Sequence, residues 1–321
     1  MFKQICQLMF VIVATVGCSP DYGIIGHDEI YIEVPVEVPG EPLGKQWVDS
    51  FVQPSSVEGV DILWVIDTSG SMYDDYTRLM DGIEAMINNL PPTGWRLNMI
   101  SNSPNVVHQD QQFPLVPGDD VTDAEHMYSN MYIGHYEQGF DASYEYIINN
   151  PYAPTWMRHD AALLVVFVSD EDDQSDMSVS QFTNWYTNLR PSVFLASIVH
   201  LDPTESICNS LSMFTGQNYI DATNYFNGVI VDICSEDWTP GVTDASNQVE
   251  PYEWYGLTYT PIEDSIRVFI DHAPNQKWYY EPSDNTVYFT ELPPAGAWVE
   301  IAYRHEDSEL ASTVNQAQVG P

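Results

Sequence analysis

The stretch that decides the fold is VDILWVIDTSGSM, residues 60–72. It begins with a run of apolar, largely β-branched residues, which is typical of a buried strand. The run stops at a polar turn in which Asp67, Ser69 and Ser71 alternate. A carboxylate and two hydroxyls at one strand end suit Mg²⁺, Mn²⁺ or Ca²⁺ better than a soft metal. The same residues also fit an ordinary polar turn that binds no ion.

Two catalytic motifs that place an Asp or a Ser at such a turn do not fit. A phosphatase-type aspartate nucleophile needs a second Asp where Ser69 stands, and a serine-hydrolase elbow needs Gly-x-Ser-x-Gly, which residues 68–70 do not supply. The eight histidines are scattered and form no His-Glu-x-x-His motif. We therefore expect that the protein is not an enzyme.

Apolar periodicities on either side of this stretch alternate between strand and helix. They predict helices over residues 76–90, 139–148 and 178–189, and strands over residues 95–100, 162–168 and 192–199. Such alternation indicates a mostly parallel sheet flanked by helices. Ligands of these sheets bind beyond the carboxyl ends of the strands, which is where Asp67 lies.

Two regions have weaker patterns. Residues 104–133 are polar and rich in turn residues, and we expect a surface loop or a short edge hairpin there. Short helices over residues 208–214 and 222–233 are expected to close the domain.

A second strand ends in an unusually acidic loop. Residues 162–168 lead directly into SDEDDQSD, residues 169–176. So many carboxylates repel one another, and a bound cation would relieve that repulsion. An EF-hand does not fit, because Ser175 and Gln181 occupy the places of its central Gly and final Glu. Residues 171–173 could surround the ion or form a solvated acidic rim, and we favour the rim.

The spacing Asp67-x-Ser69-x-Ser71 after a buried strand resembles the metal-ion-dependent adhesion site (MIDAS) of the von Willebrand factor A (VWA) family. The resemblance implies an α/β, Rossmann-like fold and assigns Asp170 as the aspartate of the third loop. The family usually has a coordinating Thr in the second loop, but residues 134–138 contain no Thr or Ser. Glu137 is the nearest substitute.

The resemblance also implies a function. In the family, a carboxylate from a protein ligand completes the coordination of a cation that the domain leaves partly open. We therefore expect a cation-dependent adhesion protein that binds Mg²⁺, with Ca²⁺ or Mn²⁺ as alternatives. The other interpretation is a structural component of an envelope assembly whose metal site is degenerate.

The charge balance argues against nucleic acid as a partner. The chain has 9 Lys and Arg against 47 Asp and Glu, which gives a net charge of −38. Such a field repels phosphate backbones and anionic membrane surfaces. The 321 residues are 44% hydrophobic and 13% aromatic, so the chain can form packed cores.

The first residues are typical of an export signal. A charged start and a short apolar run end in Ala-Thr-Val-Gly-Cys, residues 14–18, which resembles a bacterial lipoprotein box. The resemblance implies a signal peptide over residues 1–17 and lipid on Cys18, with Ser19 favouring the outer over the inner membrane. The membrane contact would be through this lipid only. An ordinary signal with an incidental cysteine is the alternative.

Export also bears on the remaining cysteines. If Cys6 leaves with the signal and Cys18 carries lipid, Cys208 and Cys234 are left to form a disulfide in an oxidising compartment. Closing that loop would contribute roughly 3 kcal/mol of stability. Two unpaired buried thiols are the alternative.

The pattern divides the chain into further segments. Residues 18–45 repeat Val, Glu and Pro and are expected to form an extended linker, or an added edge strand. A VWA domain is expected over residues 46–240, a small β domain over 241–306 and a polar tail over 307–321. The β domain shows a period of two in four segments, residues 265–270, 277–280, 286–290 and 298–303. Its aromatic residues could bind carbohydrate, although we favour a role in sheet packing.

Overall fold

The computed structural model describes residues 44–55, 59–202, 204, 206–207 and 214–306. The predicted signal peptide, the lipidation site Cys18, most of the linker, Cys208 and the polar tail lie outside the described residues. Within the described ranges, no helix combines the length and the apolar character needed to cross a membrane.

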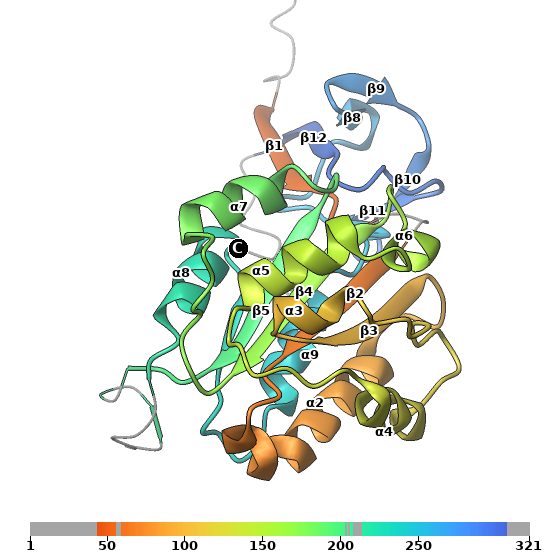
Figure 1. Cartoon of the computed structure of the whole chain (residues 1–321). Coiled ribbons are helices and arrows are strands. Elements are labelled where there is room, and N and C mark those ends of the chain that lie inside the picture. The colour runs from red at the N-terminus through yellow and green to blue at the C-terminus, as the bar shows by residue number, and fades with distance from the viewer. Residues whose placement is uncertain (1–43, 56–58, 203, 205, 208–213, 307–321) are drawn as a thin grey trace, which may run out of the picture. The chain divides into compact units, whose positions relative to one another are not determined.

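A five-stranded parallel sheet forms the centre of the α/β part (Figure 1). Its strands are β2 (Val60–Ile66), β3 (Trp95–Ser101), β4 (Ala162–Ser169), β5 (Val193–Val199) and β6 (Val229–Asp232), in the order β3-β2-β4-β5-β6. All four pairings are parallel, so the predicted fold class is confirmed.

Helices cover both faces of this sheet, and the strands alternate their side chains between two cores. On one face lie α2 (Tyr76–Asn89), α4 (Val121–Asn130) and α9 (Thr239–Asn247). On the other lie α3 (Pro104–Val107), α5 (Gly139–Tyr144), the π-helical turn η3 (Glu145–Asn149), α6 (Ala153–Trp156), α7 (Val179–Thr187) and α8 (Gln217–Tyr225). In β2, Trp64 and Ile66 face the first core, whereas Leu63 and Val65 face the second.

Two predicted segments differ from the structure. Residues 104–133 contain α3 and α4 rather than only a loop or hairpin. Helix α4 begins with a capping box, in which the side chains of Asp120 and Asp123 each accept a hydrogen bond from the backbone N–H of the other residue. Glu or Gln is the usual partner in that box, so Asp123 gave a weak sequence signal. The helix predicted over residues 222–233 is wrong in its second half, because β6 forms there and its β-branched residues favour a strand.

The β part consists of two small antiparallel sheets. One has the order β1-β12-β8-β9 and the other β10-β11-β7. The strands are β1 (Lys45–Val52), β7 (Trp254–Gly256), β8 (Arg267–Ile270), β9 (Ala273–Asn275), β10 (Trp278–Glu281), β11 (Thr286–Phe289) and β12 (Trp298–His305), with a short 3₁₀ turn η4 (Glu263–Ser265). The four predicted strands are present, and both sheets share one apolar core.

Strand β1 shows that the α/β part is inserted into the β part. It pairs with β12 along its whole length, from Lys45 opposite His305 to Val52 opposite Trp298. Phe51 stacks on Tyr255 with ring centroids 4.9 Å apart. The expected start of the VWA domain at residue 46 therefore differs from the structure, since β1 belongs with the C-terminal strands. A pairing between such distant segments leaves no local sequence signal.

At the amino ends of the parallel strands, a buried ion pair fixes β2. Asp61 has no solvent exposure. Its carboxylate accepts hydrogen bonds from the backbone N–H of Arg158, at 2.5 Å, and from the Arg158 Nε, at 2.9 Å. The same guanidinium also donates to the carbonyl oxygens of Val60 and Gly94, at 2.8 and 3.0 Å. The segment before β4 is thereby tied to the start of β2.

We predict that Arg158→Met destabilises the protein by about 3–5 kcal/mol, because it leaves the Asp61 carboxylate buried without its ion-pair partner. The double variant Asp61→Leu/Arg158→Met should recover much of that loss. Urea unfolding measures the effect, with exposed Arg267→Met as the matched control. Equal losses for Arg158→Met and Arg267→Met would contradict the prediction.

Candidate metal centre

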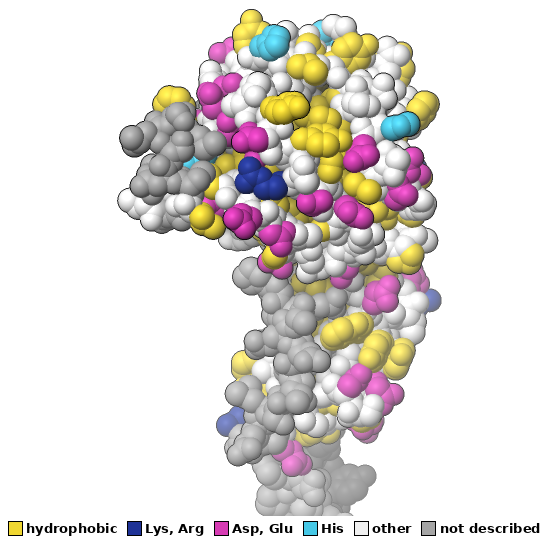
Figure 2. Space-filling view, turned by 90° about the horizontal axis from the view of Figure 1, so that it is seen from below, with side chains coloured by type: hydrophobic (Ala, Val, Ile, Leu, Met, Phe, Trp, Pro, Cys, Tyr) yellow, Lys and Arg dark blue, Asp and Glu magenta, His cyan; other side chains and the backbone are white. Residues whose placement is uncertain are grey.

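Strands β2 and β4 are parallel neighbours, so their carboxyl ends lie together at one edge of the sheet. The helix that follows β2 covers one face of the sheet, and the helix that follows β4 covers the other. A crevice forms outside the carboxyl ends of two such neighbouring strands. Asp67 and Asp170 are the residues that directly follow β2 and β4. Figure 2 looks onto the molecule from below the view of Figure 1 and shows many Asp and Glu side chains but few Lys or Arg.

The predicted residues Asp67, Ser69, Ser71 and Asp170 form one hydrogen-bonded group. The backbone N–H of Ser69 donates to Asp67 Oδ1 at 2.8 Å. The hydroxyls of Ser69 and Ser71 are 2.8 Å apart, and Ser71 donates to Asp170 Oδ1 at 3.2 Å. Asp67 and Asp170 are 1% and 4% exposed, whereas Ser71 is exposed. The group thus has a buried base of carboxylates and an open side lined by hydroxyls.

Ser169 also belongs to the group, although the sequence reasoning missed it. Its hydroxyl donates to Asp67 Oδ2 at 2.8 Å and accepts from the backbone N–H of Glu171 at 3.2 Å. The backbone N–H of Asp67 donates to the Val168 carbonyl at 2.8 Å. The available signal was the position of Ser169, which is the last residue of a strand that ends beside β2. These contacts hold the first and third loops in register.

Glu137, the predicted substitute for the missing threonine, forms a second pair of acidic side chains with Glu171. Gln174 joins the two loops by donating its backbone N–H to the Glu137 carbonyl at 2.7 Å and its Nε2 to the Glu137 Oε2 at 2.6 Å. Burial, a hydrogen bond shared with Glu171 and repulsion from Asp67 raise the pKa of Glu137 to about 8. Burial and repulsion from Asp67 also raise the pKa of Asp170. Burial, together with repulsion from neighbouring carboxylates, thus disfavours the charged forms of Glu137 and Asp170.

A hydroxyl does reach the second loop, but it comes from the first. Thr68 Oγ1 accepts from the backbone N–H of Gly134 and donates to its carbonyl, both at 3.2 Å, and lies 3.0 Å from Ser101 Oγ. A Cβ at Gly134 would lie 2.0 Å from the Cβ of Ser103. The second loop therefore approaches β3 at a position where only glycine fits.

The acidic loop after β4 is less solvated than expected. Asp173 is 7% exposed and accepts hydrogen bonds from the backbone N–H of Phe140 and from Ser175. Asp172 accepts from the backbone N–H of Asn218 at 2.8 Å, next to the start of α8. The predicted solvated rim is therefore wrong for Asp173, because its carboxylate accepts hydrogen bonds from the Phe140 backbone N–H at the start of α5 and from Ser175 in its own loop. Only the tertiary fold places the Phe140 donor beside it.

The donor set fits a hard divalent cation. None of the ion pairs among the described residues joins Lys or Arg to Asp67 or Asp170. The one Arg in the first helix, Arg78, instead binds Asp75 and the carbonyl oxygens of Ile233 and Ser235. In the described ranges, no three His, Cys, Asp or Glu side chains are placed to hold one metal ion. A metal here would thus be held by two carboxylates and two serine hydroxyls.

The predicted disulfide stays a prediction, because Cys208 lies outside the described residues. Its expected partner, Cys234, is half-buried and packs against the core beneath α2 and α9.

No protein-family model matches this chain, and neither does any curated protein. Among solved structures, proximal thread matrix protein 1 from the mussel byssus is 12% identical, with 62% of this chain and 48% of that chain covered and a TM-score of 0.40. The ArnB paralog VWA2 from Sulfolobus acidocaldarius is 9% identical, with 81% and 66% covered and a TM-score of 0.39. The pilus adhesin SpaC from Lactobacillus rhamnosus GG is 11% identical, with 82% and 42% covered and a TM-score of 0.38.

The match to the mussel protein thus spans about half of that chain's length. At these identities and TM-scores, the likeness assigns this protein neither to a family nor to a function.

We predict that Gly134→Ala destabilises the protein by about 1–3 kcal/mol, because the new methyl group overlaps Ser103. Gly70→Ala is the matched control, since no atom lies within 4 Å of the Cβ it would add. Urea unfolding of both variants checks the prediction. A loss at Gly134 no larger than at Gly70 would contradict it.

The raised pKa of Glu137 predicts that the metal-free protein loses stability as pH rises. The ordinary pKa is 4.5 and the folded value is about 8, so the folded state keeps a proton that the unfolded chain releases. The contribution is fully present below pH 4.5 and is lost as pH approaches 8. Urea unfolding in EDTA at pH 5 and pH 8 measures the decline, and Glu137→Gln should reduce it. An identical decline in Glu137→Gln would refute this assignment.

Proposed function

We propose that this protein binds a divalent cation between β2 and β4 and, through that ion, a carboxylate of a protein ligand. The observation that carries the proposal is the pair Asp67 and Asp170, two buried carboxylates that neighbouring strands bring to one hydrogen-bonded group. Burial of a charge without a partner is costly, and a cation would remove that cost.

The two ends of β2 support this reasoning by their contrast. Asp61, near the start of the strand, is buried and has Arg158 as its cation. Asp67, directly after the strand, is equally buried and has no ion pair within the part of the chain that the structure describes. A divalent ion would neutralise the charges of Asp67 and Asp170, as the Arg158 guanidinium neutralises that of Asp61.

The oxygen ligands indicate which ion to expect. Carboxylates and hydroxyls favour hard cations, and Mg²⁺ keeps several waters when only one or two carboxylates bind it. The exposed Ser71 leaves one side of the group open, so that a ligand oxygen could replace one of those waters. We therefore propose Mg²⁺ as the main ion, with Ca²⁺ and Mn²⁺ as alternatives, in a site resembling the MIDAS of VWA domains.

The setting of this activity rests on the sequence. The lipoprotein box predicts an exported protein held by lipid on Cys18, with the outer membrane favoured, so the proposed role is adhesion at the cell envelope. The charge of −38 makes nucleic acid an unsuitable partner. Within this proposal the protein is a binding protein and not an enzyme.

One observation favours the alternative of a structural component with a degenerate site. The second loop offers the backbone of Gly134 rather than a threonine hydroxyl, and Thr68 is already bonded to that backbone. If those contacts serve only to close the loops together, the domain could act as a scaffold in an envelope assembly without an ion.

Calorimetry of the full chain with Mg²⁺, Ca²⁺ and Mn²⁺ separates the two functions. We predict that Asp67→Asn and Asp170→Asn each weaken binding at least tenfold, because each removes one of two anionic ligands. At a concentration 100 times the Kd, the ion should stabilise the wild type by about 2.7 kcal/mol.

Asp160→Asn, at a largely exposed side chain, is the matched control and should bind like the wild type. Equal binding by the wild type and Asp67→Asn would favour the structural role. A pull-down from native envelope with and without EDTA then tests whether the ion is needed for a protein partner.

A further inference from the structure

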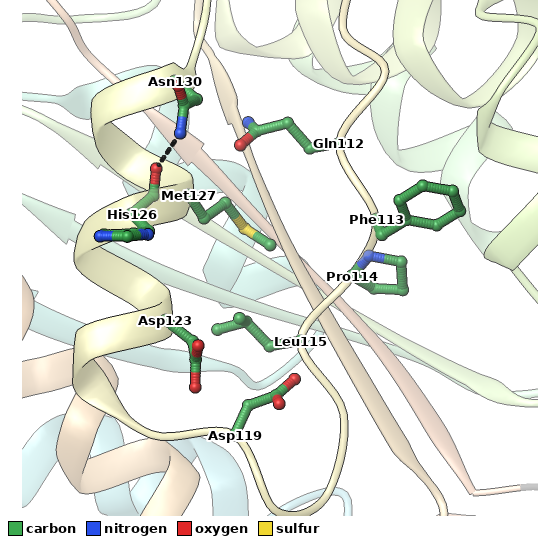
Figure 3. A pocket seen from close by; sticks show the side chains of 9 residues that line it. All are labelled: Gln112, Phe113, Pro114, Leu115, Asp119, Asp123, His126, Met127 and Asn130. Carbon is green, nitrogen blue, oxygen red and sulfur yellow. Dashed lines mark hydrogen bonds between the residues drawn. The ribbon is translucent and has the colours of Figure 1, made fainter.

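A second pocket lies at the β3 edge of the sheet, between α4 and the segment that precedes it (Figure 3). It has a volume of about 370 Å³ and is lined by residues 112–115, by Asp119 and by one face of α4. The predicted metal residues do not line it. The pocket is therefore distinct from the metal centre.

The floor of the pocket is apolar and fixed in place. Leu115 and Met127 form it, and they are 5% and 6% exposed. Leu115 is held by two backbone hydrogen bonds with Leu97 of β3, at 2.7 and 3.0 Å. In Figure 3 the Leu115 side chain points toward α4, whereas Phe113 projects from the other side of its segment. The pocket is thus formed before any partner binds.

Two carboxylates stand at one end of this floor, close together in Figure 3. Asp119 Oδ2 accepts from the backbone N–H of Val116 at 2.8 Å, and Asp123 Oδ2 accepts from that of Asp120 at 3.0 Å. These bonds orient both groups and use one oxygen of each. The ion pairs of the described chain include neither Asp119 nor Asp123.

We propose that this pocket binds a Lys or Arg side chain presented by a protein partner. Such side chains lay their methylene groups on apolar surface and keep the charged end beside polar groups. Here the methylene groups would cover Leu115 and Met127, and the cation would lie between the second oxygens of Asp119 and Asp123. The amides of Gln112 and Asn130 stand at the opposite end.

The charge balance favours a side chain that comes from a partner over one from this chain. The chain has only 9 Lys and Arg. Arg78, Arg96 and Arg158 are bound to internal carbonyl or carboxylate oxygens. A basic segment of another protein would be attracted by the surrounding field, which also speeds its association. A small inorganic cation would gain nothing from the apolar floor.

The test uses the full chain and the capped peptide Ac-Ala-Arg-Ala-NH₂, followed by the shifts of backbone amide signals. We predict saturable shifts over residues 112–130. Two control peptides separate the two features of the pocket: citrulline removes the charge, and diaminopropionate keeps a charge but lacks the long stem. Each should bind at least tenfold more weakly than the arginine peptide.

The double variant Asp119→Asn/Asp123→Asn should lose at least tenfold in affinity for the arginine peptide, while its amide oxygens still accept the backbone hydrogen bonds. Asp160→Asn is the control for the charge change and should bind like the wild type. Equal affinity for citrulline, no loss in the double variant, or the same shifts on adding Ca²⁺ alone would overturn the proposal. The peptide results do not depend on the metal centre, because the peptide titrations are run in EDTA.

Discussion

The structure depends on two carboxylates that neighbouring parallel strands deliver to one place. Asp67 and Asp170 lie close because β2 and β4 are adjacent and end at the same edge of the sheet. The helices that follow the two strands cover opposite faces of the sheet, an arrangement that forms a crevice at the carboxyl ends of such strands. Ser69, Ser71 and Ser169 surround the pair with hydroxyls. Among the described residues, no Lys or Arg forms an ion pair with either carboxylate.

The rest of the α/β part shows how such charges are handled elsewhere in the chain. The Asp61 carboxylate is neutralised by Arg158 at the amino ends of the same strands. Asp173 has no ion pair among the described residues, but it accepts hydrogen bonds from the Phe140 backbone N–H of α5 and from Ser175. Glu137 has a raised pKa because burial and the nearby carboxylates favour its protonated form. Each of these three carboxylates is thus stabilised by a guanidinium, by hydrogen-bond donors or by protonation.

Much of the fold could be predicted because its signals are local. The apolar runs of β2 and β4 and the periodicity of α2 were each visible within about a dozen residues. The predictions that were wrong concern elements whose sequence signal is weak or whose pairing partner lies far away in the chain. Asp123 is an unusual capping-box residue, so α4 was missed. Residues 46–52 were placed in the α/β domain, whereas they form most of β1, because the partner strand β12 lies at the other end of the described chain.

For the site, the sequence by itself determined the ligand types and their positions at strand ends, since strand period and turn chemistry are local properties of the backbone. Only the tertiary structure decided which of these groups meet. In the folded protein, Ser71 donates a hydrogen bond to Asp170 and Ser169 donates one to Asp67, whereas Asp173 accepts one from the backbone of α5. The reason is that hydrogen bonds and repulsion between carboxylates act over a few ångströms in space. The order of strands in the sheet, rather than spacing along the chain, sets those distances.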